Sequence, residues 1–167
     1  MNLRTFFALL VAVPLAACGQ VADLDAVPQA KVGCETPTEA QLNASETMLP
    51  GRNCMSCHVS SGQAKDEPLG TGGTVYGARN TKTCNTGGVD GVTVDLLDPA
   101  GNVVASTKTN AAGNFHFPPT ATNFKNVSAR VTKGSMTMKM TTPVDVSVGC
   151  ATCHWATGNA GDRIYIQ

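Results

Sequence analysis

The chain has few of the large side chains that usually fill a protein core. Aromatic residues make up 5% of its 167 residues, whereas 17 residues are glycine. A core so short of aromatic rings gains from another stabilising element, such as a cofactor or a disulfide. The composition therefore favours one small domain that is held together by more than apolar packing.

The chain also has no excess of charge of either sign, and it has few histidines. Lys and Arg total 12 and Asp and Glu total 12, so there is no basic excess for binding nucleic acid. Of the three histidines, only His116 does not follow a Cys-x-x-Cys pair, and no base flanks it. We find no acid pair and no phosphate-binding loop, and the pattern argues against Ser-His-Asp catalysis.

No apolar run is long enough to span a bilayer. Residues 6–17 read FFALLVAVPLAA after a short basic start, which is too short for a membrane helix and typical of a secretory signal. The segment 15–19, LAACG, resembles a bacterial lipobox, in which cleavage precedes a cysteine that is then lipidated. We therefore expect a signal peptide at 1–17 and a lipid anchor on Cys18; a plain signal peptide is the alternative.

By the same resemblance, Gly19 after the lipidated cysteine implies the outer membrane of a Gram-negative bacterium. We expect a lipid-anchored protein of the cell envelope, with the membrane as one partner. Residues 18–35 have no apolar periodicity and would form the lipidated tether.

The seven cysteines can be assigned in full. Cys18 would carry lipid, and four others form the two Cys-x-x-Cys pairs. Cys34 and Cys84 remain, and in an exported, oxidising compartment two leftover thiols most simply pair with each other. The sequence therefore predicts a Cys34–Cys84 disulfide.

Hydrophobic periodicity divides the rest of the chain into a helical and a β part. A capping box formed by Thr36 and Glu39 predicts a short helix that Pro50 and Gly51 end, within a segment 36–62. From Gly72 the period is two, with turns about every ten residues. This pattern is typical of an all-β sandwich. The expected strands are 74–76, 92–96, 103–109, 115–117, 127–132, 136–141 and 144–148.

Residues 72–148 resemble the carboxypeptidase-regulatory-like, transthyretin-like β-sandwich family. The resemblance lies in GTVYG and in GVTVDLLDPAGNVVASTKTNAAGNFHF, and the Cys84-bearing insertion after the first strand departs from it. It implies a mainly β fold: a single Greek-key-type sandwich of six or seven strands, preceded by one short helix. It says almost nothing about function, because such domains are mostly scaffolds or adhesion modules.

Two short motifs flank the sandwich. Residues 54–58 read CMSCH and residues 150–154, in the last segment 149–167, read CATCH. Cys-x-x-Cys-His is the attachment signature of haem c, since two thiols at this spacing can bond both vinyl groups of one porphyrin. The resemblance to c-type cytochromes implies two covalently bound haem c groups. Cys54, Cys57, Cys150 and Cys153 would attach them, with His58 and His154 as proximal iron ligands.

Three other uses of the four cysteines stay open. They can form a tetrathiolate metal site, two redox dithiols or two short disulfides. None of these needs a histidine directly after each pair, and two such histidines by chance would be a rare coincidence.

The sixth iron ligands are less defined. His116 lies between Phe115 and Phe117, so on a strand it would face away from both rings, either as a solvent-facing residue or as a distal ligand. Met48, before the first motif, is a weak candidate. Met136, Met138 and Met140 alternate along one strand and are more typical of core filling.

These observations predict electron transfer with redox partner proteins rather than catalysis. The alternatives are a small haem enzyme of the peroxidase type, which an open iron position would allow, and a β-sandwich binding module. In the last case the cysteine pairs would hold a non-haem metal or form disulfides.

Overall fold

The computed structural model describes residues 34–35, 45–79, 81–146, 149–155 and 158–167. The expected signal peptide, Cys18 and most of the tether lie outside these residues, as do residues 36–44 of the expected helix. The described end of that segment, 45–50, forms turns and bends.

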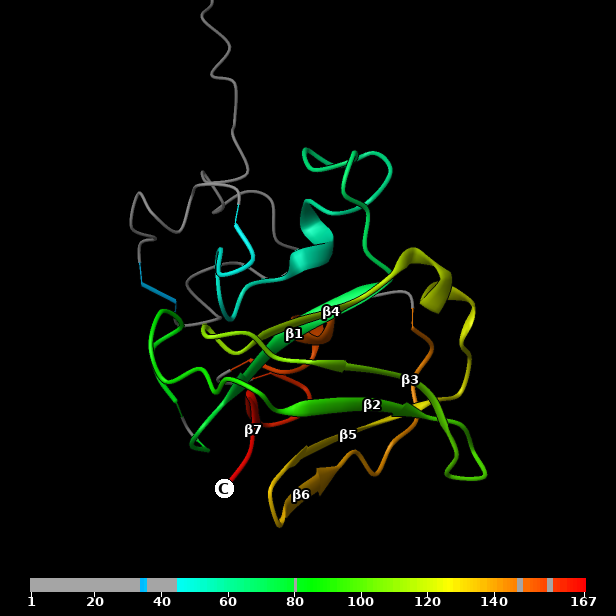
Figure 1. Ribbon diagram of the computed structural model, residues 1–167. Coiled ribbons are helices and arrows are strands. Elements are labelled where there is room, and N and C mark those ends of the chain that lie inside the picture. The colour runs from blue at the N-terminus through cyan, green and yellow to red at the C-terminus, as the bar shows by residue number, and fades with distance from the viewer. Residues whose placement is uncertain (1–33, 36–44, 80, 147–148, 156–157) are drawn as a thin grey trace, which may run out of the picture.

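The described residues form two β-sheets (Figure 1). The smaller sheet has the order β4-β1-β7, from Asn114–Phe117, Thr71–Tyr76 and Ile164–Tyr165. The larger has the order β3-β2-β5-β6, from Val103–Lys108, Thr93–Leu97, Ser128–Lys133 and Met136–Lys139. All neighbouring strands are antiparallel except β1 and β7. This confirms the predicted mainly β sandwich with little helix.

The core lies between the sheets, and in β4 its burial follows the period of two. Val94 and Leu96 of β2 are buried, as are Phe115 and Phe117 of β4. Alternate side chains of a strand point to opposite faces, so each sheet presents one apolar face to the other. Further buried apolar side chains complete this core: Val75, Val92, Ala121, Val127, Val131, Val146 and Ile166.

Two details differ from the expected strands, and the expectation for the methionines holds only in part. Val144 makes only an isolated bridge with Val127, and the described part of the expected strand 144–148 is not a strand. The two-residue strand β7 was not predicted, because its pairing with the distant β1 leaves no periodic pattern. Of the methionines expected in the core, Met138 packs against it, whereas Met136 is exposed.

The predicted Cys34–Cys84 disulfide is present, with the two Cα atoms 5.0 Å apart. It anchors the long connection after β1. The hydroxyl of Tyr76 donates a hydrogen bond to the Cys84 carbonyl at 2.9 Å, and the Glu35 carboxylate accepts one from the Cys84 N–H at 2.7 Å. The residues before the first motif are thereby tied to the end of β1.

Candidate haem-attachment site

The two Cys-x-x-Cys-His segments, here called the first CxxCH turn (54–58) and the second CxxCH turn (150–154), have the same backbone shape. Each begins with one turn of 3-10 helix, η2 (Cys54–Ser56) or η4 (Cys150–Thr152). The N–H of His58 donates to the Cys54 carbonyl at 3.0 Å, and that of His154 to the Cys150 carbonyl at 2.9 Å. Both cysteines and the histidine of each motif are thus held on one tight turn.

Both histidine rings are oriented in the same way. Nδ1 of His58 lies 2.7 Å from the Glu67 carbonyl oxygen, and Nδ1 of His154 lies 3.1 Å from that of Asp162. A carbonyl only accepts, so Nδ1 carries the proton and donates it, which leaves the lone pair on Nε2. A hydrogen bond from Nδ1–H to a backbone carbonyl is typical of histidines that ligate a metal through Nε2.

The likeness of the two segments extends beyond the histidines. Gly62 and Gly158 each close a turn onto the residue after the histidine. The N–H of Ala64 then donates to the Cys57 carbonyl, and that of Ala160 to the Cys153 carbonyl. The motif-based prediction stopped at the histidines, although the shared pattern C-x-x-C-H-x-x-x-G-x-A is visible when the motifs are aligned with each other.

Glycine is required at the fourth position after each histidine. A Cβ at Gly62 would overlap the Cys57 carbonyl, and one at Gly158 would overlap the Cys153 carbonyl. These glycines let the chain fold back over its own CxxCH turn. The two segments therefore share one local design that extends past the five residues of the motif.

Both CxxCH turns pack against β1, at two adjacent glycines (Figure 1). A Cβ at Gly72 would lie 3.3 Å from the Cys54 sulfur, and one at Gly73 would lie 3.0 Å from the Cys150 Cβ. Since neighbouring residues of a strand face opposite sides, the first cysteines of the two motifs lie on opposite faces of β1.

The two CxxCH turns also touch each other. Asn53 caps η2, because its Oδ1 accepts a hydrogen bond from the Met55 N–H at 3.1 Å. Its Nδ2 lies 3.5 Å from the Thr152 hydroxyl in η4. The structure thus brings together two motifs from opposite ends of the domain.

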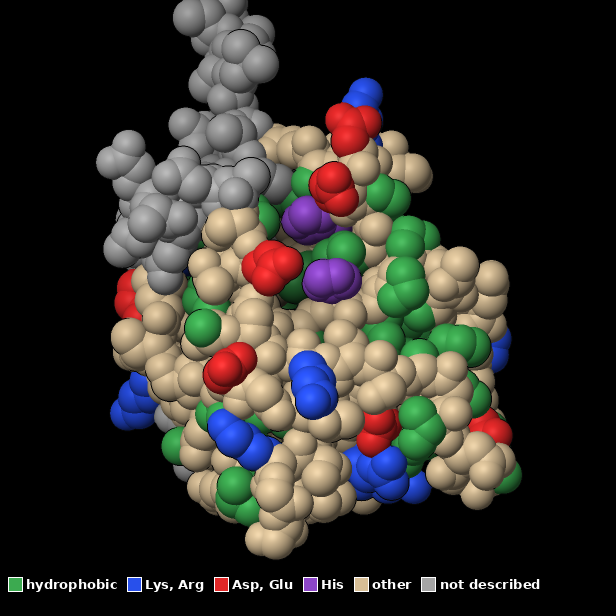
Figure 2. Space-filling view, viewed as in Figure 1, with side chains coloured by type: hydrophobic (Ala, Val, Ile, Leu, Met, Phe, Trp, Pro, Cys, Tyr) green, Lys and Arg blue, Asp and Glu red, His purple; other side chains and the backbone are tan. Residues whose placement is uncertain are grey.

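His116 lies on the outer face of β4, next to the first CxxCH turn. Phe115 and Phe117 point into the core, so the predicted orientation of His116 away from both rings is correct. Figure 2 shows histidine side chains grouped on this face, with apolar surface between them.

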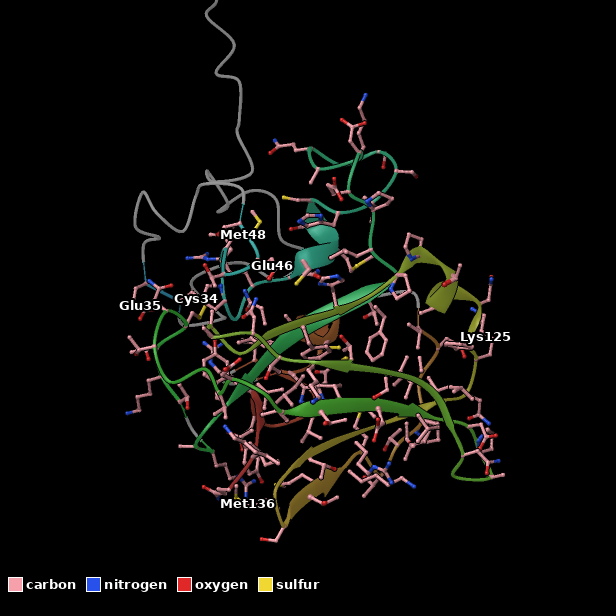
Figure 3. The ribbon with its side chains drawn as sticks, viewed as in Figure 1. Cys34, Glu35, Glu46, Met48, Lys125 and Met136 are labelled. Carbon is pink, nitrogen blue, oxygen red and sulfur yellow. A yellow bond between two sulfur atoms is a disulfide. The ribbon has the colours of Figure 1, made fainter. Side chains whose placement is uncertain are left out.

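Met48, the weak candidate for an iron ligand, lies far from Met136, which was expected in the core (Figure 3). Met48 lies on the side of η2, where its carbonyl accepts a hydrogen bond from Asn114 at 2.8 Å. Met136 is at the opposite end of the molecule, on β6.

The cysteines of the two motifs differ in state. Cys54, Cys150 and Cys153 are thiols, whereas Cys57 is disulfide-bonded. Burial raises the pKa of the Cys150 thiol to about 11. Burial also lowers the pKa of His154 below its ordinary value, against the opposing effect of the hydrogen bond to Asp162.

Among the described residues, no three His, Cys, Asp or Glu side chains gather into a metal-binding group. All four motif cysteines are among the residues searched, so their arrangement gives no support to a tetrathiolate site. The same part of the chain contains no helix long and apolar enough to cross a membrane.

Comparison with known proteins returned no matching family, no matching curated protein and no matching solved structure.

Proposed function

We propose that the protein is a dihaem c-type cytochrome that transfers electrons in the cell envelope, anchored to the outer membrane through lipid on Cys18. The observation that carries this proposal is the matched geometry of the two CxxCH turns. In both, the histidine Nδ1–H donates a hydrogen bond to a backbone carbonyl, so Nε2 is left as the ligand atom. This geometry repeats in two segments that share the pattern C-x-x-C-H-x-x-x-G-x-A and differ at the other positions.

The residues of the first CxxCH turn fit covalent attachment. Cys54 and Cys57 would form the thioethers, and His58 would bind iron from the proximal side. Thioether formation needs a reduced sulfur, so the disulfide of Cys57 and attachment at Cys57 are alternative states of one residue. Cys150, Cys153 and His154 would have the same roles in the second turn.

When bound, haem c supplies an iron that gains and loses one electron. The chain's own contribution is to orient each proximal imidazole through the Glu67 or Asp162 carbonyl, on turns that pack against β1. Covalent attachment also removes the need for a large apolar pocket, which agrees with the aromatic-poor composition. Such fixed ligation is suited to electron transfer.

The charge around the first CxxCH turn favours a cationic redox partner. Glu46, Asp66 and Glu67 are exposed on the segments beside it, with Lys65 among them. Haem propionates would add further negative charge. Complementary charge mainly speeds the encounter of two proteins and makes it sensitive to salt.

The first test is expression of the chain together with a haem-maturation system, followed by intact-mass measurement and the reduced visible spectrum. We expect a mass increase of two haems and covalent c-type absorption bands. Replacing Cys54 and Cys57 by Ala should leave one haem, and so should replacing Cys150 and Cys153. A colourless protein at the mass of the apoprotein, while a control cytochrome matures normally, would overturn the proposal.

A further inference from the structure

We propose that His116 is the sixth ligand of the iron held at the first CxxCH turn, which makes the two haem sites chemically unequal. This inference rests on the proposed dihaem function and assigns a residue to one of its two sites.

The first argument is the position of His116 relative to Cys54. In the β1–β4 register His116 is paired with Gly72. A Cβ at Gly72 would lie 3.3 Å from the Cys54 sulfur and 3.5 Å from the Cβ of His116. The Cys54 sulfur and His116 therefore lie on either side of Gly72, on the same face of β1.

The second argument is that the His116 imidazole is available. Phe115 and Phe117 are 4% and 1% exposed, and their burial fixes the side chain of His116 on the outer face of β4. His116 itself is exposed, and no hydrogen bond or ion pair within the described part of the chain involves its ring. Within the described residues, both ring nitrogens are therefore open to a ligand.

The third argument is that the surroundings of the second CxxCH turn differ from those of the first. Cys150 faces the other side of β1, where a Cβ at Gly73 would lie 3.2 Å from the Phe115 ring. The chain has three histidines, and two of them are the proximal ligands of the proposed sites. With His116 at the first iron, no histidine of this chain is left for the second, which would have another ligand or an open position.

The test uses the holoprotein and compares H116G with the wild type. The control is K108A, which alters an exposed end of β3. Intact mass first confirms two haems in each protein. Near-infrared magnetic circular dichroism of the oxidised proteins then reports the ligands of each iron.

We expect the wild type and K108A to show one bis-histidine signal, and H116G to lose it. Reduced H116G should bind one more carbon monoxide per molecule than the wild type. Added imidazole should restore the low-spin signal, which a merely structural role of His116 would not predict. If H116G does not accumulate, H116M tests the same assignment, because it should convert the bis-histidine signal to a His/Met signal.

Two haems with unchanged spectra in H116G or H116M would overturn this inference and leave the proposed function intact. A wild-type protein without haem would instead overturn the proposed function.

Discussion

Asn53 and Gly149 are in direct contact, and through them the two CxxCH turns meet. Asn53 precedes Cys54, and Gly149 precedes Cys150. A Cβ at Gly149 would overlap Oδ1 of Asn53, the atom that caps η2. The contact therefore depends on glycine at position 149 and couples the packing of one turn to the capping of the other.

We expect G149A to lower the free energy of unfolding by about 1–3 kcal/mol, because the added methyl group must displace Asn53. Urea unfolding followed by circular dichroism measures the change. The control is G77A, whose added Cβ would meet a Val89 side-chain methyl at 3.2 Å and would otherwise have ordinary contacts. Equal losses in both variants would show that the Asn53–Gly149 contact is not special.

Replacing Cys34 and Cys84 together by Ala should destabilise the protein by about 2–5 kcal/mol, because the disulfide closes a loop between residues 50 positions apart. Urea unfolding without reductant measures the difference from the wild type. The difference should largely disappear when both proteins are unfolded in the presence of a reductant. An unchanged stability without reductant would contradict the prediction.

The ionisation of Tyr76 should make the protein sensitive to alkaline pH. Burial raises the pKa of Tyr76 from 10.0 to about 12, and the side chain is 1% exposed. A group whose pKa is higher in the folded state stabilises fully below its unfolded pKa. This contribution, on the order of 2–3 kcal/mol, is therefore present below pH 10 and is lost as the pH rises through 12.

Y76F tests this prediction, because it cannot ionise. Below pH 10 it should be less stable than the wild type by about 1 kcal/mol, since the hydrogen bond to the Cys84 carbonyl is lost. Above pH 10 the gap should narrow and reverse. A gap that stays constant across the alkaline range would contradict the assigned pKa.

Local patterns in the sequence predicted the sandwich well. The strict alternation in β2 and the turn between β2 and β3 follow from side-chain period and turn chemistry, which act over a few residues. The pairing of β7 with β1 was missed, because a two-residue parallel strand has no local signal. The predicted Cys34–Cys84 disulfide followed from counting thiols and not from their spacing.

The candidate site, too, is predicted in part by local sequence patterns and depends in part on the tertiary fold. The cysteine and histidine spacing of each motif is visible in the sequence, whereas the carbonyls of Glu67 and Asp162 that hold the rings are not. A backbone carbonyl has no residue identity that a motif can specify. The contact between Asn53 and Thr152 likewise depends on the tertiary fold.

Gly72 and Gly73 allow a separate test of each CxxCH turn. A Cβ at Gly72 would approach the Phe115 carbonyl at 2.9 Å and the Cys54 sulfur, whereas one at Gly73 would approach Cys150. We expect G72A to reduce haem attachment mainly at the first turn and G73A mainly at the second. Intact mass of proteolytic fragments, each with one motif, measures the fraction that carries haem. Equal losses at both turns in both variants would contradict the separate packing.

The contact between the two CxxCH turns predicts that the two haems of the proposed cytochrome interact. Asn53 joins η2 to η4, so the attachment points of the two irons lie on neighbouring segments. Electron paramagnetic resonance of the fully oxidised protein should show broadened, coupled signals. These should sharpen in a variant with Cys150 and Cys153 replaced by Ala, which keeps only the first haem. Two independent signals in the wild type, each identical to that of a single-haem variant, would mean that the haems extend away from each other despite the contact of their turns.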